Sequence, residues 1–433
     1  MKNWEKKEYL WELVEKHQEE LLQICSELIQ IPSANWKGIE ESLRYCCGFL
    51  EALGVSYQVL RPCGEIPCIV AEVGKPDGNF GILNGHLDVV EPGDLSRWSY
   101  DPYCGTITDT QILGRGASDM KCGCGVLLFL FKLIVEENLD LQGRLVLHLV
   151  NDEEQGSEQG SKWLIENGYA DGAEFCIITE PTSYDSIEIG QKGRARLLLR
   201  TSGSLNDGGI IKDAKESAIH KMIHILSRIQ ELTLLEGTVT EAEQRIVEAS
   251  QGIIQGAMNH QGVGGAINHV NVNILSIDGG PSSAMTSELC EARLALGVPF
   301  MISREQVHEK LLEIIRESGA ECEIEYLSWD SGARTDGNEA LVHSVRNNAE
   351  RITGRTMTPT YQWATSDAKY YRSHGIPTIQ FGPSNNKGIH SHNEDVEISD
   401  VIKCAKTHLA VLEDMLGFQI DAYHTDHKAS GTH

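Results

Sequence analysis

The ten residues 81–90, GILNGHLDVV, constrain this chain more than any other stretch. Their apolar start predicts a buried strand, which ends on an imidazole at His86 and a carboxylate at Asp88. Residues two apart in an extended segment point the same way, so Asp88 can reach the His86 ring. A metal-bound histidine usually donates its other N–H to a carboxylate. By itself the stretch fits a metal ligand and an ordinary hydrogen-bonded histidine about equally well.

A second acidic residue, Asp119, follows the glycine-rich segment GRGAS and precedes an apolar helix predicted over 125–137. Small residues let the backbone approach a ligand closely, so a carboxylate at this junction suits a metal. An aspartate that only caps the helix N-terminus is the alternative.

Two further predicted strands, 144–150 and 175–179, also end in acids. The first leads into Glu153 and Glu154, and the second into Glu180. Adjacent glutamates at the end of a buried strand are costly unless something positive pairs with them, although a solvated acidic loop is the alternative. Ligands of open α/β sheets bind at the carboxyl ends of the strands, so we expect these acids to meet there.

The collected strand-end groups form a set of imidazoles and carboxylates: His86, Asp119, Glu154, Glu180 and His390, with Asp88 and Glu153 behind them. Such a set suits two divalent ions that share one carboxylate. Magnesium or calcium would want more oxygens, so zinc is favoured, with cobalt or manganese as alternatives. Two ions about 3.5–4 Å apart can share a water, and a spare carboxylate can move its proton.

Composition restricts the function classes. The 433 residues carry a formal net charge of −26, which would repel a phosphate backbone, so nucleic acid is not an expected partner. The 12 cysteines show no C-x-x-C spacing and indicate reduced thiols in a cytoplasmic protein. The N-terminus lacks the apolar core of a signal peptide, and no apolar run approaches the ~20 residues that cross a membrane.

The middle of the chain has a different texture. Strands are predicted over 194–201, 270–277, 288–296 and 322–327, and helices over 212–232 and 304–318. This β-α-β-β-α-β order is that of a ferredoxin-like module. It carries few aspartates or histidines in suggestive places, so it is predicted to be an inserted domain over 193–330, between catalytic-domain segments 1–192 and 331–433. Near the N-terminus, one helix is predicted over 10–29.

The chain resembles the two-metal aminoacylase and carboxypeptidase family, which includes acetylornithine deacetylase, succinyl-diaminopimelate desuccinylase, carboxypeptidase G and several dipeptidases. Eight segments carry the resemblance, in the family's order: LIQIPS (28–33), NGHLDVV (84–90), GRGASDMK (114–121), NDEEQGS (151–157), TEPT (179–182), TSDAKY (365–370), FGP (381–383) and IHSHNE (389–394). The resemblance implies an α/β fold, with a mixed-sheet zinc-peptidase-like catalytic domain and an inserted ferredoxin-like α+β lid.

The resemblance also implies roles. Asp119 would bridge two ions, with His86 and Glu180 completing one site and Glu154 and His390 the other. Glu153 would be the general base and Asp88 the support of His86; His392 is the rival to His390. The implied activity is hydrolysis of an amide bond in an N-acyl amino acid, of deacetylase or desuccinylase type, or in a dipeptide. The implied partners are a small substrate with a carboxylate and a second copy bound through the lid; neither nucleic acid nor membrane is expected.

The lid departs from the family pattern. Asp207 stands where the family carries a lid histidine, the following proline is absent, and Ala284 replaces the asparagine of Gly-Gly-x-x-x-Asn. The resemblance implies that the lid histidine stabilises the tetrahedral oxyanion of the reaction. Losing one such donor typically lowers the rate by ~10²–10³-fold. His260 and His269 are candidate replacements.

Two cationic residues are candidate substrate contacts. Lys369 replaces the family's arginine after Ser-Asp-Ala and keeps the charge without the bidentate fork. Arg293, in a predicted lid strand, can meet a substrate carboxylate or form a structural salt bridge.

A catalytically weak, metal-loaded protein with a ligand-binding role is the alternative function. The altered lid favours that alternative, whereas the intact metal set opposes it. A purely structural metal site fits less well, because structural zinc sites are closed and thiolate-rich.

Overall fold

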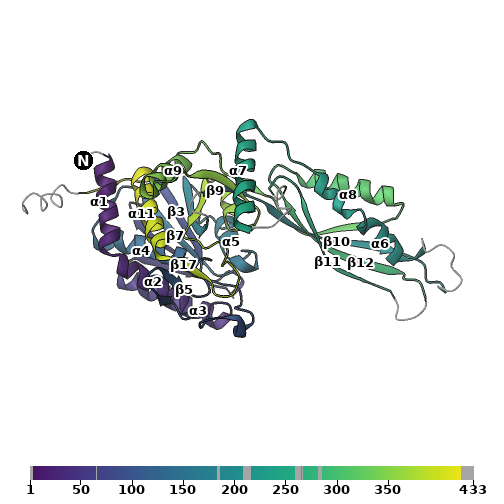
Figure 1. Cartoon of the computed structure of the whole chain (residues 1–433), viewed down its shortest axis with the longest axis horizontal. Coiled ribbons are helices and arrows are strands. Elements are labelled where there is room, and N and C mark those ends of the chain that lie inside the picture. The colour runs from purple at the N-terminus through teal and green to yellow at the C-terminus, as the bar shows by residue number, and fades with distance from the viewer. Residues whose placement is uncertain are drawn as a thin grey trace, which may run out of the picture. The chain divides into compact units, whose positions relative to one another are not determined.

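A computed structural model describes residues 3–64, 66–182, 186–207, 216–258, 265, 267–280 and 285–420 (Figure 1). These residues form two compact units. The first takes in the chain up to Ile189, Thr335–Pro359 and the part from Tyr370 onward. The second takes in Gly190–Arg334 and Thr360–Lys369. Each unit is built around its own sheet.

The sheet of the first unit is mixed, which confirms the predicted fold class. Its strands lie in the order β1 (Ser56–Leu60), β2 (Cys68–Gly74), β7 (Arg144–Val150), β3 (Phe80–His86), β8 (Phe175–Pro181), β16 (Thr378–Gly382) and β9 (Ser186–Gln191). The central strands β7, β3, β8 and β16 are parallel, whereas β1, β2 and β9 pair antiparallel with their neighbours. Every residue of β3 and β8 is buried, as expected for central parallel strands covered on both faces.

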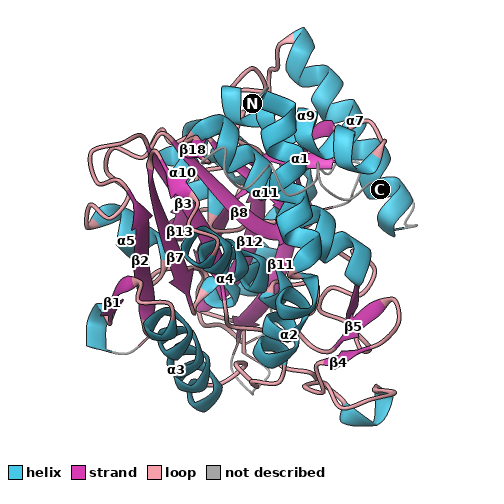
Figure 2. Ribbon diagram, turned by 90° about the vertical axis from the view of Figure 1, so that its left-hand side faces the viewer, coloured by secondary structure: helices cyan, strands magenta, loops and turns pink. Residues whose placement is uncertain are grey.

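Helix α4 (Lys121–Glu136) contacts β3 and β8, and Figure 2 shows it lying across these strands. Its approach to β8 is close, because a Cβ at Gly123 would stand 2.4 Å from the Thr179 carbonyl oxygen. The remaining helices of this unit are α1 (Asn3–Lys16), α2 (Gln18–Ile29), α3 (Trp36–Ala52), α5 (Ser161–Glu166), α9 (Ala340–Thr353) and α11 (Ile398–Met415), and α10 (Ala368–Ser373) begins at its border. Two small sheets complete it: a three-stranded one of β4 (Thr106–Ile107), β5 (Gln111–Leu113) and β17 (Asp395–Glu397), and a pair of β6 (Asp140–Leu141) with β18 (Phe418–Gln419).

The single helix predicted over 10–29 is wrong, because the chain breaks at His17 into α1 and α2. His17 leaves helical geometry with φ −107° and ψ 16°. Its two ring nitrogens lie 2.7 Å from a Glu20 oxygen and 2.6 Å from a Glu137 oxygen. These contacts accompany a bend that apolar periodicity alone does not reveal.

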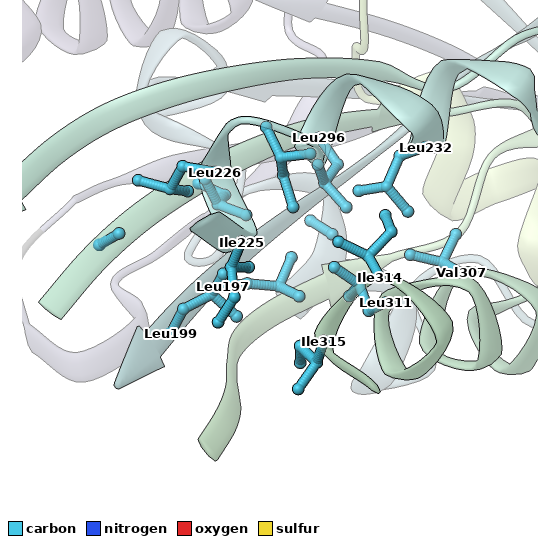
Figure 3. Packing of buried hydrophobic residues seen from close by; sticks show 14 of the residues in the cluster. Leu197, Leu199, Ile225, Leu226, Leu232, Leu296, Val307, Leu311, Ile314 and Ile315 are labelled. Atoms are coloured by element: carbon cyan, nitrogen blue, oxygen red, sulfur yellow. The ribbon is translucent and has the colours of Figure 1, made fainter. Parts of the chain in front are cut away.

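The second unit has the predicted β-α-β-β-α-β order: β10 (Gly193–Ser202), α6 (Ala218–Leu226), β11 (Asn271–Gly279), β12 (Leu289–Val298), α8 (Arg304–Ser318) and β13 (Glu323–Asp330). An additional helix, α7 (Glu241–Met258), precedes β11. The short strands β14 (Ala333–Arg334) and β15 (Thr358–Gln362) come after β13 in the chain and both pair with β9. The antiparallel sheet runs β11-β12-β10-β13. Figure 3 shows its core, in which Leu197 of β10 lies among Ile225 of α6 and Leu311 of α8.

The helix predicted over 212–232 is shorter than expected. Residues 212–215 lie outside the described residues, α6 ends at Leu226, and a 3₁₀ segment, Ile229–Leu234, follows. None of the described helices is long and apolar enough to cross a membrane. All of the cysteines whose side chains are described are free thiols.

A buried ion pair holds the N-terminal helix against α11. The Lys7 side chain is 4% exposed, and its Nζ lies 2.7 Å from the Asp414 carboxylate. That carboxylate also accepts hydrogen bonds from Ser344 Oγ at 2.7 Å and Asn348 Nδ2 at 2.9 Å. Removing the Asp414 carboxylate leaves the buried Lys7 ammonium without this partner and takes away an acceptor shared by Ser344 and Asn348.

Asp414→Ala is therefore expected to lower the free energy of unfolding by about 2–4 kcal/mol, measured by urea denaturation. The control is Glu158→Ala, which removes the partner of Lys162 in a pair whose glutamate is 65% exposed and should change stability by less than about 1 kcal/mol. Equal effects of the two substitutions would contradict the assigned role of Asp414.

Candidate metal centre

The predicted site residues of the first unit gather at one edge of its sheet. His86 ends β3, Glu180 lies near the end of β8, and Glu153 and Glu154 open a 3₁₀ turn directly after β7. Because β3, β7 and β8 are parallel, their carboxyl ends meet at the same edge. The expectation that these strands deliver their polar ends to one place is confirmed.

Asp119 lies between two groups of side chains. Its Oδ1 is 3.2 Å from His86 Nε2, and its Oδ2 is 3.2 Å from His390 Nε2. His86 Nε2 also lies 3.5 Å from Glu180 Oε1, and His390 Nε2 lies 3.0 Å from Glu154 Oε1. The structure thus forms one group from His86, Asp119 and Glu180, and another from Asp119, Glu154 and His390, with donor atoms within 4.8 Å of one another in each.

Both groups fit a divalent cation. They offer carboxylate oxygens and imidazole nitrogens without a thiolate, which suits an ion that keeps open positions. Hydrogen bonds to Asp119 and Glu154 raise the pKa of His390 to about 10. Burial opposes the charged form of His86, yet its contacts with Asp119, Asp88 and Glu180 hold its pKa well above the usual value. The carboxylates therefore favour positive charge at both positions.

Asp88 contacts His86 with its carboxylate, as predicted, and supports the site in two further ways. The nearer acceptor of His86 Nδ1–H is the Asp88 backbone oxygen at 2.9 Å, whereas the Asp88 carboxylate lies 3.5 Å from Nδ1. A carbonyl can only accept, so Nδ1 carries a proton, and Nε2 is the ring nitrogen that faces Asp119 and is left to bind an ion. The Asp88 carboxylate also accepts the backbone N–H groups of Glu153, at 3.4 Å, and Glu154, at 3.1 Å.

The turn that carries the two glutamates is fixed at its far end as well. It closes on Gly156 at φ +114°, a conformation that favours glycine. The Gly156 carbonyl accepts a hydrogen bond from Tyr370 Oη at 3.0 Å. Glu154 belongs to the second metal group, whereas Glu153 belongs to neither group.

A residue that sequence reasoning did not single out, Glu394, joins the two loops that carry Asp119 and His390. Its side chain is fully buried. Its Oε1 accepts the backbone N–H groups of Gly116, Ser118 and Asp119 at 3.2, 3.0 and 3.0 Å. Its other oxygen pairs with the buried Arg115 guanidinium, and burial raises the pKa of Glu394 to about 7. The only signal in the sequence is an acid four residues after His390.

The other predicted residues belong to neither metal group. The His392 ring packs edge-on against Trp98, with 6.1 Å between centroids, and is in neither metal group. Arg293, in the second unit, is 48% exposed and lies 3.9 Å from Asp278. Lys369, also in the second unit, is buried and lies 3.3 Å from Asp330.

The structure describes only some of the lid residues at which the chain departs from the family pattern, and of the histidines that could replace the missing one. His269 Nδ1 lies 3.0 Å from the Thr233 oxygen. Asp207 forms an isolated bridge with Met285. His260 and Ala284 lie outside the described residues.

Imidazoles and carboxylates around a shared aspartate, at the carboxyl edge of a mixed sheet, are the arrangement of a metallohydrolase. The sequence profile of Peptidase family M20/M25/M40 matches residues 82–414, more than half of the chain. The chain belongs to this family, and it is a hydrolase that acts on amide or peptide bonds.

Known relatives cover nearly the whole chain. An N-formyl-4-amino-5-aminomethyl-2-methylpyrimidine deformylase from Halalkalibacterium halodurans is 27% identical over 430 residues, spanning 92% of this chain and 95% of the relative. A succinyl-diaminopimelate desuccinylase from Wolbachia pipientis is 26% identical over 396 residues, spanning 88% and 90%. An M20 family metallo-carboxypeptidase from Sulfolobus solfataricus has a similar structure, with a TM-score of 0.74 at 20% identity over 91% of this chain and 98% of that one. These similarities favour a hydrolase over a weakly active binding protein.

Proposed function

We propose that this protein is a dinuclear zinc amidohydrolase that removes a small acyl group from an N-acyl amino acid or a related amine, or splits a dipeptide. The observation that carries the proposal is Asp119, whose two oxygens face different histidines at 3.2 Å each. In this assignment, His86 and Glu180 would hold one ion, Glu154 and His390 would hold the other, and Asp119 would serve both.

Each residue of the candidate site then has a chemical role. When bound, a pair of divalent ions would polarise the amide carbonyl and acidify a water. Glu153 lies beside Glu154 but belongs to neither metal group, so it is the carboxylate that would accept the proton of the attacking water and pass it to the leaving amine. Asp88 fixes the backbone of both glutamates and, through its carbonyl, the tautomer of His86.

The names of the relatives narrow the choice of acyl group. The deformylase name specifies an N-formyl amine, and the desuccinylase name an N-succinyl amino acid. Both reactions release an amine from a small acyl amide, which supports deacylation ahead of dipeptide cleavage. Cobalt or manganese could take the place of zinc, since the same donor types bind them.

The test combines metal analysis with a substrate panel. We expect about two divalent ions per chain, loss of turnover with a chelator, and recovery when zinc, cobalt or manganese is added back. Matched N-formyl, N-acetyl and N-succinyl amines and amino acids, with dipeptides as the comparison set, would identify the acyl group. Turnover that survives complete removal of the metal would refute the proposal.

We also propose a homodimer formed through the second unit. Strand β11 is an edge strand of its sheet, and it exposes Leu275 by 49% and Ile277 by 53%. A long edge with exposed apolar side chains is a surface that a second chain can pair with. Ile277→Lys should convert the dimer to a monomer in sedimentation velocity, and a monomeric wild type would refute this assembly.

Free thiols in the described residues support a cytoplasmic location.

A further inference from the structure

A pocket of about 290 Å³ within the second unit has a charge opposite to that of the chain. Its charged lining residues are Lys192 and Arg194, and its described lining includes no aspartate or glutamate. The whole chain has 63 acidic and 37 basic residues, so a pocket whose charged lining residues are all basic differs in sign of charge from the protein as a whole. The polar lining is completed by Asn271, Asn273 and Thr365.

Lys192 is buried, with 2% of its surface exposed. Its Nζ donates to the His269 backbone oxygen at 2.6 Å and to the side-chain oxygen of Asn271. Both acceptors are neutral, and within the part of the chain that the structure describes no carboxylate compensates this amine. Burial lowers the pKa of Lys192 to about 7. Buried charges are normally paired, and an ammonium has a third N–H to donate.

Two further features point to a ligand. Thr365 Oγ1 is buried and has no hydrogen-bond partner among the described residues, although buried hydroxyls usually have one. Two small residues, Ala295 and Gly297, line the pocket, and a Cβ at Gly297 would already stand 3.4 Å from Asn271 Oδ1 and 3.7 Å from Lys192 Cδ. Small residues therefore keep the recess open beside an amine and a hydroxyl that can still donate.

We propose that this pocket binds the carboxylate of a small anionic molecule, with Lys192 Nζ and Thr365 Oγ1 donating to its oxygens and Arg194 adding positive charge. The pocket is near the lower end of the volumes that hold small molecules. The carboxylate can come from the substrate itself, which rests on the proposed function, or from a separate carboxylate effector, which does not.

Binding is tested with succinate, by isothermal titration calorimetry on the zinc-loaded full-length protein. Lys192→Met should weaken succinate binding by about 10–100-fold, the range for a hydrogen bond to a charged group. Thr365→Val should weaken it less, because it removes a neutral donor. The matched control is Arg196→Gln, which removes an exposed cation from the same strand outside the pocket and should leave the affinity unchanged. Thermal unfolding of each variant verifies that it is folded.

The metal centre could also bind succinate, so His390→Ala is measured in parallel. Binding that survives His390→Ala and is lost in Lys192→Met supports the pocket. Binding that survives Lys192→Met and is lost in His390→Ala, or no binding to the wild type, overturns it while leaving the proposed hydrolase intact.

The source of the carboxylate is decided by kinetics on an N-acyl amino acid and its carboxamide. If the carboxylate belongs to the substrate, Lys192→Met should raise KM by about 10–100-fold for the acid alone, with kcat little changed. If Lys192→Met abolishes succinate binding but leaves both KM values unchanged, the pocket serves a separate effector. The calorimetric result stands even if neither compound is hydrolysed, so failure of the proposed function can be told apart from failure of the pocket.

Discussion

Glu153→Gln is expected to lower kcat by about 10²–10⁴-fold, the contribution typical of a general base, while about two metal ions stay bound. The amide keeps the size of the side chain and the backbone N–H that Asp88 accepts at 3.4 Å, so the turn should be preserved. What it removes is the only carboxylate of this turn that lies outside both metal groups. KM should change little, because the proton acceptor acts after the substrate is bound.

The matched control is Glu154→Gln, the neighbouring change in the same turn. Glu154 Oε1 lies 3.0 Å from His390 Nε2 in the second group, so its loss should reduce the metal content as well as the rate. Metal analysis together with kcat separates the two residues. Wild-type turnover in Glu153→Gln with both ions present would show that another group moves the proton.

The part of the candidate site that lies at strand ends could be predicted from the sequence. His86, Glu154 and Glu180 follow apolar runs that can only be central strands, and the rule that parallel strands present their carboxyl ends together brings them to one edge. The same logic does not extend to side chains that act through the backbone. The Asp88 carboxylate reaches His86 Nδ1 at 3.5 Å, as expected, but the Asp88 carbonyl is the nearer acceptor at 2.9 Å, and the carboxylate also accepts two N–H groups of the next turn. A spacing of two residues sets the direction of a side chain but not its acceptor.

Glu394 and the pocket at Lys192 lay beyond the sequence for a related reason. Each depends on segments far apart in the chain, 114–119 with 394 and 192 with 271 and 365, and no periodicity encodes such contacts. The break at His17 is also a long-range effect, since one of its partners is Glu137. Local patterns predicted the elements and the members of the two candidate metal groups, whereas the contacts that support those residues required the folded chain.

Glu394→Ala is expected to lower the free energy of unfolding by about 3–5 kcal/mol, because it leaves the buried Arg115 guanidinium uncompensated. It should also lower the affinity for both metal ions by about 10–100-fold, the usual effect of removing a residue that orients the ligands. The reason is geometric: the same carboxylate that pairs with Arg115 accepts the Asp119 N–H at 3.0 Å, and Asp119 serves both groups. Urea unfolding of the chelated protein and zinc titration of the refolded protein measure the two effects separately.

The matched control is Glu188→Ala, which breaks another fully buried ion pair of the same unit. Glu188 pairs with both terminal nitrogens of Arg372, at 3.1 and 2.9 Å, and neither residue belongs to a metal group. It should cost a similar amount of stability and leave zinc affinity unchanged. If both variants lose stability equally and both keep wild-type zinc affinity, Glu394 only stabilises the fold. If zinc affinity falls in Glu394→Ala alone, the turn that presents Asp119 is held in its ligand geometry by Glu394, and the two metal sites share that support.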